Sequence, residues 1–134
     1  MTDLTVGDVV AERSVHLTRE SLVRYAGASG DFNPIHYRDD IAVSVGLPGV
    51  LAHGMLTMGI AIGTLESWLG DPARVEEYGV RFTRPVLVDP EAGADVHVTA
   101  KVGAVDDATA RIDLTVTAAG TTVLGKAQVR VRLV

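Results

Sequence analysis

Residues 54–69, which read GMLTMGIAIGTLESWL, are the stretch that decides the fold. The segment is apolar nearly all round and contains no charged residue before Glu66, a pattern typical of a helix buried in a protein core. A helix of roughly 16 residues is about 24 Å long. Gly70 and Pro72 follow it and favour an end at this point. We therefore predict one long apolar helix from Gly54 to about Leu69, around which the rest of the chain must pack.

Most of the sequence after this helix alternates between apolar and polar side chains, as strands with one buried and one solvated face do. The apolar members are Tyr78, Val80 and Phe82; Val96, Val98, Ala100 and Val102; Ile112, Leu114 and Val116; and Ala127, Val129, Val131 and Leu133. A valine-rich segment at residues 9–17 predicts a further strand. The apolar face of this sheet needs a cover, and the helix at 54–69 is the only long apolar element available. The expected fold is of the α+β class, with one curved antiparallel sheet wrapped around one central helix.

Two short helices are predicted between the first strand and the long helix. Thr18 is a good N-cap, because its hydroxyl can accept a bond from a free backbone N–H, and helical spacing of apolar residues follows at 19–28. Asp39 is expected to cap a second helix that runs through Val45. Residues 31–34 form a turn between the two, since a proline ends this segment and excludes the preceding residue from the helical region.

Size and composition restrict the class of protein. A chain of 134 residues suggests one domain over residues 1–134, and its 47% hydrophobic and 22% charged residues are typical of a folded protein. A net charge of -5, 4% aromatic residues and no run of Lys or Arg argue against nucleic-acid binding. There is no cysteine, which excludes disulfides, thiolate metal sites and cysteine nucleophiles.

A membrane protein is not expected. Residues 41–65 contain no Asp, Glu, Lys or Arg and are long enough to cross a bilayer, but Pro48 and three glycines between Gly46 and Gly54 interrupt them. The N-terminus has no basic region followed by an apolar run, so a signal peptide is not expected either. We expect a cytoplasmic protein with no membrane span.

An aspartate and a histidine lie five residues apart in the turn that precedes the long helix, within the segment DFNPIH at 31–36. A carboxylate can accept a proton and an imidazole exchanges one near neutral pH, so Asp31 and His36 could act together on one water molecule. Polar residues held in loops are often functional. The alternatives are structural, with Asp31 as a turn residue bonded to its own backbone and His36 as a surface or core histidine.

The start of the predicted helix adds a candidate anion site. Gly54 stands where unpaired backbone N–H groups and the helix dipole favour negative charge, and its missing side chain lets a carbonyl oxygen approach. A simple tight turn is the alternative. Asn33 could hydrogen-bond Asp31 or a substrate, or merely start a turn with the proline that follows it. His53 is expected to pack against or orient its neighbours without a chemical step of its own.

Two other chemistries fit the sequence poorly. Asp31, His36 and His53 have no known metal-ligand spacing, so no metal site is predicted. No Gly-x-Ser-x-Gly sequence is present, so a serine hydrolase is not expected.

The two halves of the motif, DFNPIH at 31–36 and AHGMLTM at 52–58, resemble the signature of the MaoC-like, (R)-specific enoyl-thioester hydratases. The resemblance continues through YAGASG at 25–30 and VRFTRPV at 80–86. Within that family the chain looks most like the catalytic beta subunits of actinobacterial (3R)-hydroxyacyl-ACP dehydratases. The pair of half-motifs at this spacing is specific, and either half alone would be less so.

The resemblance implies a single hot-dog fold, in which a long helix is wrapped by an antiparallel sheet. It implies that Asp31 and His36 are the catalytic pair, that Gly54 supplies an oxyanion-hole N–H, and that Asn33 supports them. The implied reaction is the reversible hydration of trans-2-enoyl thioesters, or dehydration of (3R)-hydroxyacyl thioesters, with no metal or redox cofactor.

The implied substrates are acyl thioesters of coenzyme A or of acyl carrier protein, and the implied assembly is a homodimer or a heterodimer with another hot-dog subunit. Recognition of the carrier would depend on surface cations, for which the candidates are Arg74, Arg81, Arg84, Arg130 and Arg132. Two alternative functions remain open. One is hydrolysis of acyl thioesters on the same fold, and the other is a non-catalytic subunit that binds acyl chains and stabilises a partner.

Overall fold

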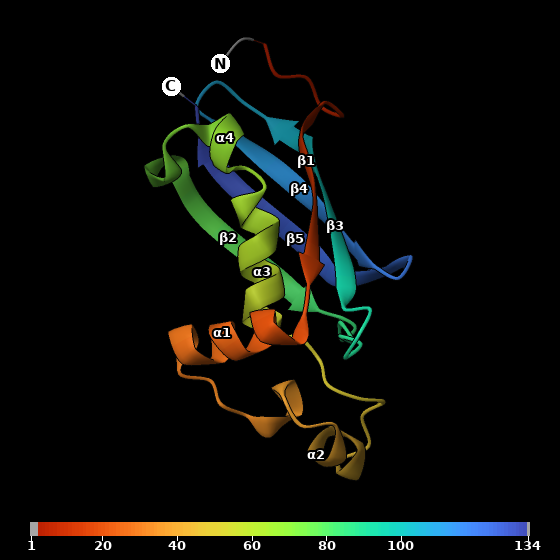
Figure 1. Ribbon diagram of the computed structural model, residues 1–134. Coiled ribbons are helices and arrows are strands. Elements are labelled where there is room, and N and C mark those ends of the chain that lie inside the picture. The colour runs from red at the N-terminus through yellow and green to blue at the C-terminus, as the bar shows by residue number, and fades with distance from the viewer. Residues whose placement is uncertain (1–2, 134) are drawn as a thin grey trace.

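The computed structural model describes residues 3–133, which form one antiparallel sheet and a set of short helices (Figure 1). In chain order the elements are β1 (Val9–Leu17), α1 (Arg19–Ser29), the 3-10 helix η1 (Pro34–His36), α2 (Asp39–Ser44), α3 (Gly54–Gly63), α4 (Glu66–Leu69), the 3-10 helix η2 (Pro72–Arg74), β2 (Val75–Phe82), β3 (Ala94–Val105), β4 (Thr109–Ala118) and β5 (Thr121–Arg132). One strand is thus followed by all the helices and then by four strands, as the alternation of side chains predicts.

The five strands pair in the order β1-β3-β4-β5-β2, so β1 and β2 are the edges of the sheet. Helices α3 and α4 lie across one face of the sheet (Figure 1). The predicted core residues of β3, β4 and β5 are buried beneath them: Val96, Val98, Ala100, Val102, Ile112, Leu114, Val116, Ala127, Val129 and Val131. The hot-dog arrangement of the α+β class is therefore confirmed.

Strand β2 departs from its predicted pattern at Phe82, which is 57% exposed. Tyr78 and Val80 are partly buried against the core, in agreement with the prediction. Phe82 is the last residue of this edge strand, and its ring lies so close to the start of α3 that a Cβ on Gly54 would come within 2.9 Å of it. The ring therefore covers the beginning of the helix instead of entering the core.

The prediction of one helix over 54–69 is wrong, because two helices occupy this segment. The N–H groups of Thr64 and Leu65 bond to carbonyl groups only three residues back, which tightens the turn between α3 and α4. The Thr64 hydroxyl donates to the Ile60 carbonyl at 3.2 Å, the acceptor that a continuous α-helix would use for the Thr64 N–H. This local competition ends α3 before Leu65.

Helix α3 is also less enclosed than its sequence predicts. Thr57 and Ala61 are buried, whereas Met55 is 59% exposed.

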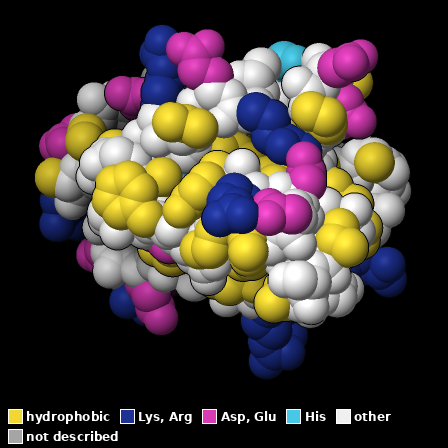
Figure 2. All heavy atoms as spheres, turned by 60° about the horizontal axis from the view of Figure 1, so that its bottom comes forward, with side chains coloured by type: hydrophobic (Ala, Val, Ile, Leu, Met, Phe, Trp, Pro, Cys, Tyr) yellow, Lys and Arg dark blue, Asp and Glu magenta, His cyan; other side chains and the backbone are white. Residues whose placement is uncertain are grey.

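Figure 2 shows hydrophobic side chains gathered over the end of the molecule that carries α1 and α2, with a few charged side chains among them. No helix within residues 3–133 has the length and apolar character needed to cross a membrane.

Helix α1 begins and ends as predicted, with Thr18 as its N-cap and Gly30 closing it in the left-handed conformation. The prediction for α2 needs correction, because Asp39 is its first residue and not its cap. The Asp39 carboxylate instead accepts the N–H of Val50 at 3.1 Å and pairs with Arg19 at 2.9 Å. These bonds tie the segment that leads into α3 to the start of α1.

Candidate active site

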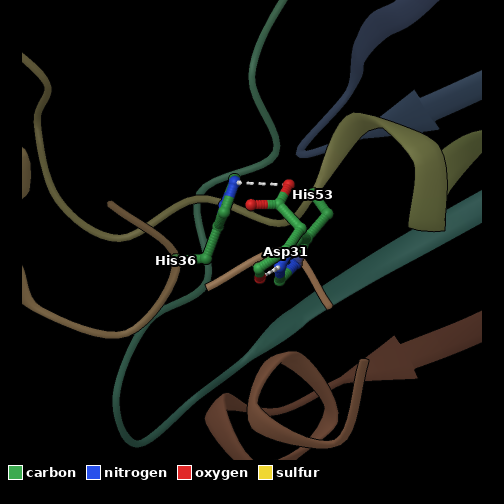
Figure 3. A group of neighbouring side chains, drawn as sticks. All are labelled: Asp31, His36 and His53. Carbon is green, nitrogen blue, oxygen red and sulfur yellow. Dashed lines mark hydrogen bonds and ion pairs between the residues drawn. The ribbon is translucent and has the colours of Figure 1, made fainter. Parts of the chain in front are cut away.

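The turn between α1 and η1 holds its shape through bonds from side chains to its own backbone. The Asp31 carboxylate accepts the N–H of Asn33 at 3.1 Å, and the Asn33 side chain accepts the N–H of Ile35 at 3.2 Å. Asn33 is thereby the N-cap of η1, Pro34 is the first residue of that helix, and His36 is the last. The turn uses one carboxylate oxygen of Asp31, and the other faces His36 (Figure 3).

The structure brings Asp31 and His36 together across a gap of 4.0 Å, measured from Oδ2 to Nε2. This distance is too long for a direct hydrogen bond, but one water molecule placed between the two atoms could bond to both. The Nδ1 atom of His36 lies 2.7 Å from the carbonyl oxygen of Leu51. Because a carbonyl only accepts, Nδ1 must carry the proton, and the neutral imidazole presents a bare Nε2 to Asp31. Two proton acceptors therefore face one gap.

His53 contacts both members of this pair. Its ring stacks on that of His36 with centroids 3.8 Å apart and 21° between the planes, and its Nε2 lies 3.1 Å from the Asp31 carbonyl oxygen (Figure 3). The Tyr25 ring packs edge-on against His53, with centroids 4.7 Å apart. One ring thus fixes the relative positions of the turn, of η1 and of α1.

The environment of His53 keeps its ring neutral. Nε2 must donate to the Asp31 carbonyl, so Nδ1 is bare, and this buried atom has no hydrogen-bond partner within the described chain. Protonation would place a second N–H there without an acceptor and beside another imidazole. Burial is the main cause that lowers the pKa of His53 below its ordinary value of 6.5, and the neighbouring His36 acts in the same direction.

Helix α3 begins immediately after His53, and its first N–H groups are free. His53 supplies no side-chain cap, and the N–H groups of Gly54 and Met55 have no hydrogen-bond partner in the part of the chain that the structure describes. A cavity of about 270 Å³ opens beside Gly54, with Thr57 and Phe82 also in its walls. Free N–H groups at a helix start favour an anionic oxygen at this wall.

Asp31 and His36 do not line that cavity themselves. His53 joins the two parts of the site, since it contacts both residues and is the neighbour of Gly54 in the chain. The arrangement therefore places a proton-accepting pair on one side of His53 and an anion-stabilising helix start on the other.

Three side chains that could bind a metal ion lie close together at this site. Ligand atoms of Asp31, His36 and His53 lie within 4.8 Å of one another, although their sequence spacing matches no metal motif. Each histidine already uses one ring nitrogen in a bond to a carbonyl oxygen, from Leu51 or from Asp31. Asp31 Oδ2 and His36 Nε2 face one another without a direct hydrogen bond, and these two atoms also suit the binding of water.

Comparison with known families assigns the chain on most of its length. The MaoC like domain matches residues 4–123. The chain belongs to this family. The site described above is therefore the site of a MaoC-like protein.

Two relatives carry names that describe a reaction. The 3-hydroxyacyl-thioester dehydratase X of Mycobacterium tuberculosis is 39% identical over 79 residues, which are 59% of this chain and 27% of the relative. The (R)-specific enoyl-CoA hydratase of Rhodospirillum rubrum is 32% identical over 87 residues, which are 64% of this chain and 60% of the relative. The matched stretch is less than two thirds of the length of either relative.

Solved structures support the family from the fold. A structure described as a MaoC-like dehydratase has a TM-score of 0.94 at 41% identity, covering 98% of this chain and 41% of that chain. A chain in the ChsH1-ChsH2 complex from Mycobacterium tuberculosis has a TM-score of 0.85 at 23% identity and covers 100% of both chains. At that identity the second likeness shows the shared fold alone.

Sequence reasoning missed three contributors to the site: the Tyr25 ring, the Leu51 carbonyl and the Phe82 ring. Tyr25 and Phe82 lie within the segments 25–30 and 80–86 that carry the resemblance, and the resemblance could have pointed to both residues. The Leu51 carbonyl had no signal, since a main-chain acceptor leaves no pattern in the side chains.

Proposed function

We propose that this chain catalyses the reversible, (R)-specific addition of water to trans-2-enoyl thioesters, and in reverse the dehydration of (3R)-hydroxyacyl thioesters. The observation that carries the proposal is the bare Nε2 of His36, which faces the Asp31 carboxylate across 4.0 Å. The free N–H of Gly54 next to His53 supplies the complementary anion site. Membership of the MaoC-like family and similarity to a named dehydratase and a named (R)-specific hydratase support the same reaction.

In the hydration direction, one water molecule bonds to both Asp31 and His36. Its oxygen forms a bond to C3 of the enoyl thioester while one of its protons passes to the Asp31–His36 pair. The electron pair of the double bond moves toward the thioester, and the Gly54 N–H and the dipole of α3 stabilise the charge on its oxygen. A proton then passes from the pair to C2, which restores the carbonyl. Both transfers are assigned to the pair, since a water molecule between Asp31 and His36 can exchange a proton with either group.

Asn33 and His53 act in this proposal as positioning residues. Asn33 caps η1 and so sets the direction from which His36 approaches the gap. His53 holds the Asp31 backbone through its N–H and the His36 ring through the stack. Because His53 stays neutral, it does not repel a proton that His36 accepts.

The proposed substrates carry their acyl thioester on coenzyme A or on acyl carrier protein, and the proposed partner is a second hot-dog subunit, either a copy of this chain or a related one. Phe32, Met55 and Phe82 are large apolar side chains near the site that are each more than half exposed. Exposed apolar surface of this kind is typical of an interface. A chain of the same fold is part of the ChsH1-ChsH2 complex, so this fold occurs in a complex of named subunits.

The test is turnover of crotonyl-CoA and longer enoyl-CoA substrates by the purified chain, followed by the loss of enoyl absorbance together with an assay for free thiol. We expect hydration to a (3R)-hydroxyacyl product without release of thiol. Thiol release without hydration would replace the proposal with a thioesterase. Activity that appears only with an added catalytic subunit, and that survives loss of Asp31 and His36 here, would make this chain a non-catalytic subunit.

A further inference from the structure

The cavity beside Gly54 has a polar side chain in its wall that the proposed mechanism does not use. Thr57 lines this cavity, and the residue is only 3% exposed. Thr83 and Arg84 also line the cavity, but both are exposed to solvent. Thr57 therefore places a buried hydroxyl in the wall next to the anion site.

The Thr57 hydroxyl has no hydrogen-bond partner within residues 3–133. A threonine in a helix can donate to the carbonyl group four residues back. Thr64, at the end of the same helix, does so by donating to the Ile60 carbonyl at 3.2 Å. The corresponding acceptor for Thr57 is the His53 carbonyl, which instead accepts the N–H groups of Leu56 at 3.1 Å and of Thr57 itself at 3.2 Å. A carbonyl oxygen has two lone pairs, so this acceptor is already fully used.

The unpaired hydroxyl must open into the cavity. Among the described residues, Nδ1 of His53 is the single side-chain nitrogen or oxygen that is both shut off from solvent and without a partner. The Thr57 oxygen is therefore not fully enclosed, and the space that it reaches is the cavity that this residue lines. A buried polar group without a partner is unfavourable, so the hydroxyl favours a ligand that brings a hydrogen-bonding atom into the cavity.

Thr57 and Gly54 lie on one face of α3, because residues three apart in a helix are neighbours on its surface. Helical side chains lean toward the N-terminus of their helix, so the Thr57 side chain leans toward the free N–H of Gly54. Val86, Val123 and Leu124 are buried apolar residues in the wall of the same cavity. Hydrogen bonds are stronger in such apolar surroundings than in water.

We propose that Thr57 is a further catalytic residue, whose hydroxyl donates a hydrogen bond to the thioester oxygen beside the Gly54 N–H. The inference rests on the proposed function and adds a second donor to its anion site. Negative charge gathers on the thioester oxygen as water adds to C3, so this hydrogen bond strengthens toward the transition state. Thr57 keeps its proton throughout, and both proton transfers stay with Asp31 and His36.

The proposal is tested with Thr57→Val, which removes the hydroxyl at nearly constant shape, and with Thr57→Ser, which keeps it. We expect valine to lower kcat for the hydration of crotonyl-CoA at least about 10-fold with KM within about 2-fold, because an interaction of the transition state is lost. Serine should restore most of this loss. The Tm of Thr57→Val should not fall, since an apolar group replaces an unpaired hydroxyl.

Thr64→Val is the matched control, because Thr64 is another buried threonine of this segment and its hydroxyl is bonded to the backbone. This variant should lower Tm and leave kcat unchanged. An unchanged kcat in Thr57→Val would remove the hydroxyl from the reaction. Equal losses of kcat with serine and valine would assign the effect to the shape of the side chain, and either result would overturn the proposal.

A second measurement does not depend on turnover. Asp31→Asn serves as the background, so that crotonyl-CoA binds without being hydrated, and infrared difference spectra follow an isotope-labelled thioester carbonyl. We expect binding to move the carbonyl band to lower wavenumber, and to move it less when Thr57→Val is added. A band position that does not depend on residue 57 contradicts the role of Thr57 even when the wild-type chain hydrates its substrate. A dependence on residue 57 without hydration by the wild-type chain contradicts only the proposed function.

Discussion

The Leu51 carbonyl determines which nitrogen of His36 can react. By accepting from Nδ1 at 2.7 Å, it leaves Nε2 without a proton and turned toward the carboxylate of Asp31. The two side chains differ in their surroundings, because that of Asp31 is 53% exposed and that of His36 only 9%. The pair thus combines one group open to solvent with one held in a single tautomer by the backbone.

Removing either acid–base group should abolish most of the activity. We expect Asp31→Asn and His36→Ala each to lower the rate of enoyl-thioester hydration at least about 100-fold, since a positioned acid or base typically contributes that much. Asparagine can still accept the N–H of Asn33, so the turn should survive, and circular dichroism checks the fold. His16→Ala is the control, because His16 is an exposed histidine bonded to Asp95. Near-normal turnover by either variant would remove that residue from the mechanism.

The neutral state of His53 leads to a prediction about pH. Its lowered pKa means that the folded chain resists a proton that the unfolded chain accepts below about 6.5. Its contribution to the free energy of unfolding is therefore present above that pH and is lost progressively as the pH falls further. Replacement by phenylalanine retains a ring that can stack on His36 and removes the titrating group, so the acid loss of stability in urea titrations should become smaller.

The same variant separates the positioning role from simple packing. His53→Phe has no N–H for the Asp31 carbonyl, so kcat should fall about 10-fold while KM changes little. The proton resonances of the His53 ring in the wild-type chain should still be at their neutral positions at pH 6.5. Protonation of His53 above pH 6.5, or an unchanged kcat in the variant, would contradict the assigned role.

At the scale of elements, the start of α3 is a place where the structure has no room for an added side-chain atom. Gly54 leaves room for the Phe82 ring, and its N–H is free to bind an oxygen. Another glycine of the same helix, Gly59, has open space around the place of a Cβ. Two glycines of one helix thus differ in what a methyl group would meet, and this difference can be measured.

We expect Gly54→Ala to lower kcat at least about 10-fold, because the added methyl group displaces the Phe82 ring or the helix start that holds the oxyanion. Gly59→Ala is the matched control and should leave kcat unchanged while raising stability by about 0.4–1 kcal/mol, since alanine favours a helix. Adding Phe82→Ala to Gly54→Ala removes the clash and should restore part of the lost rate. A full loss with no restoration would indicate that glycine is needed for the approach of substrate and not for the ring.

At the scale of the whole molecule, the hydroxyl of a partly buried tyrosine ties the helix layer to the sheet. The Tyr78 hydroxyl on β2 donates to the Met58 carbonyl of α3 at 2.7 Å. Burial raises the pKa of Tyr78 to about 12 from an ordinary value of 10.0. The folded state therefore keeps a proton in a range of pH where the unfolded chain has lost it.

Because the pKa of Tyr78 is higher in the folded state, the folded protein should lose stability at alkaline pH as Tyr78 ionises. The stabilisation from Tyr78 is fully present below pH 10.0, falls as the pH rises, and is gone above about pH 12. Tyr78→Phe should lose about 1 kcal/mol of stability at neutral pH with its hydrogen bond, and should lose less additional stability between those two values than the wild-type chain. Urea unfolding across this range measures it, and parallel curves for the two proteins would contradict the assignment.

The apolar end of the molecule belongs to the same scale. Phe32, Met55 and Phe82 are exposed in a single chain although they lie around the candidate active site. A second subunit that covers them would shield the gap between Asp31 and His36 from bulk water. The partner in the proposed function is therefore also the element that would give the site a lower dielectric environment.

The sequence by itself determined the elements whose cause is local. Alternation along β3, β4 and β5 marks the buried face, and Thr18 marks the start of α1. Both predictions are confirmed because they depend on neighbouring residues alone. The same reasoning, applied to residues 54–69, missed the interruption at Thr64, where a hydroxyl competes for a backbone acceptor.

Only the tertiary structure decided the chemistry of the site. The proximity of Asp31 and His36 is foreshadowed by their short spacing, but the tautomer of His36 depends on Leu51, which lies 15 residues away, and the space at Gly54 depends on Phe82. Three strands supply the neighbouring cations Arg81, Arg111 and Lys126, which lie together only when those strands pair in register. Contacts between distant segments are set by packing and register, which no single stretch of sequence contains.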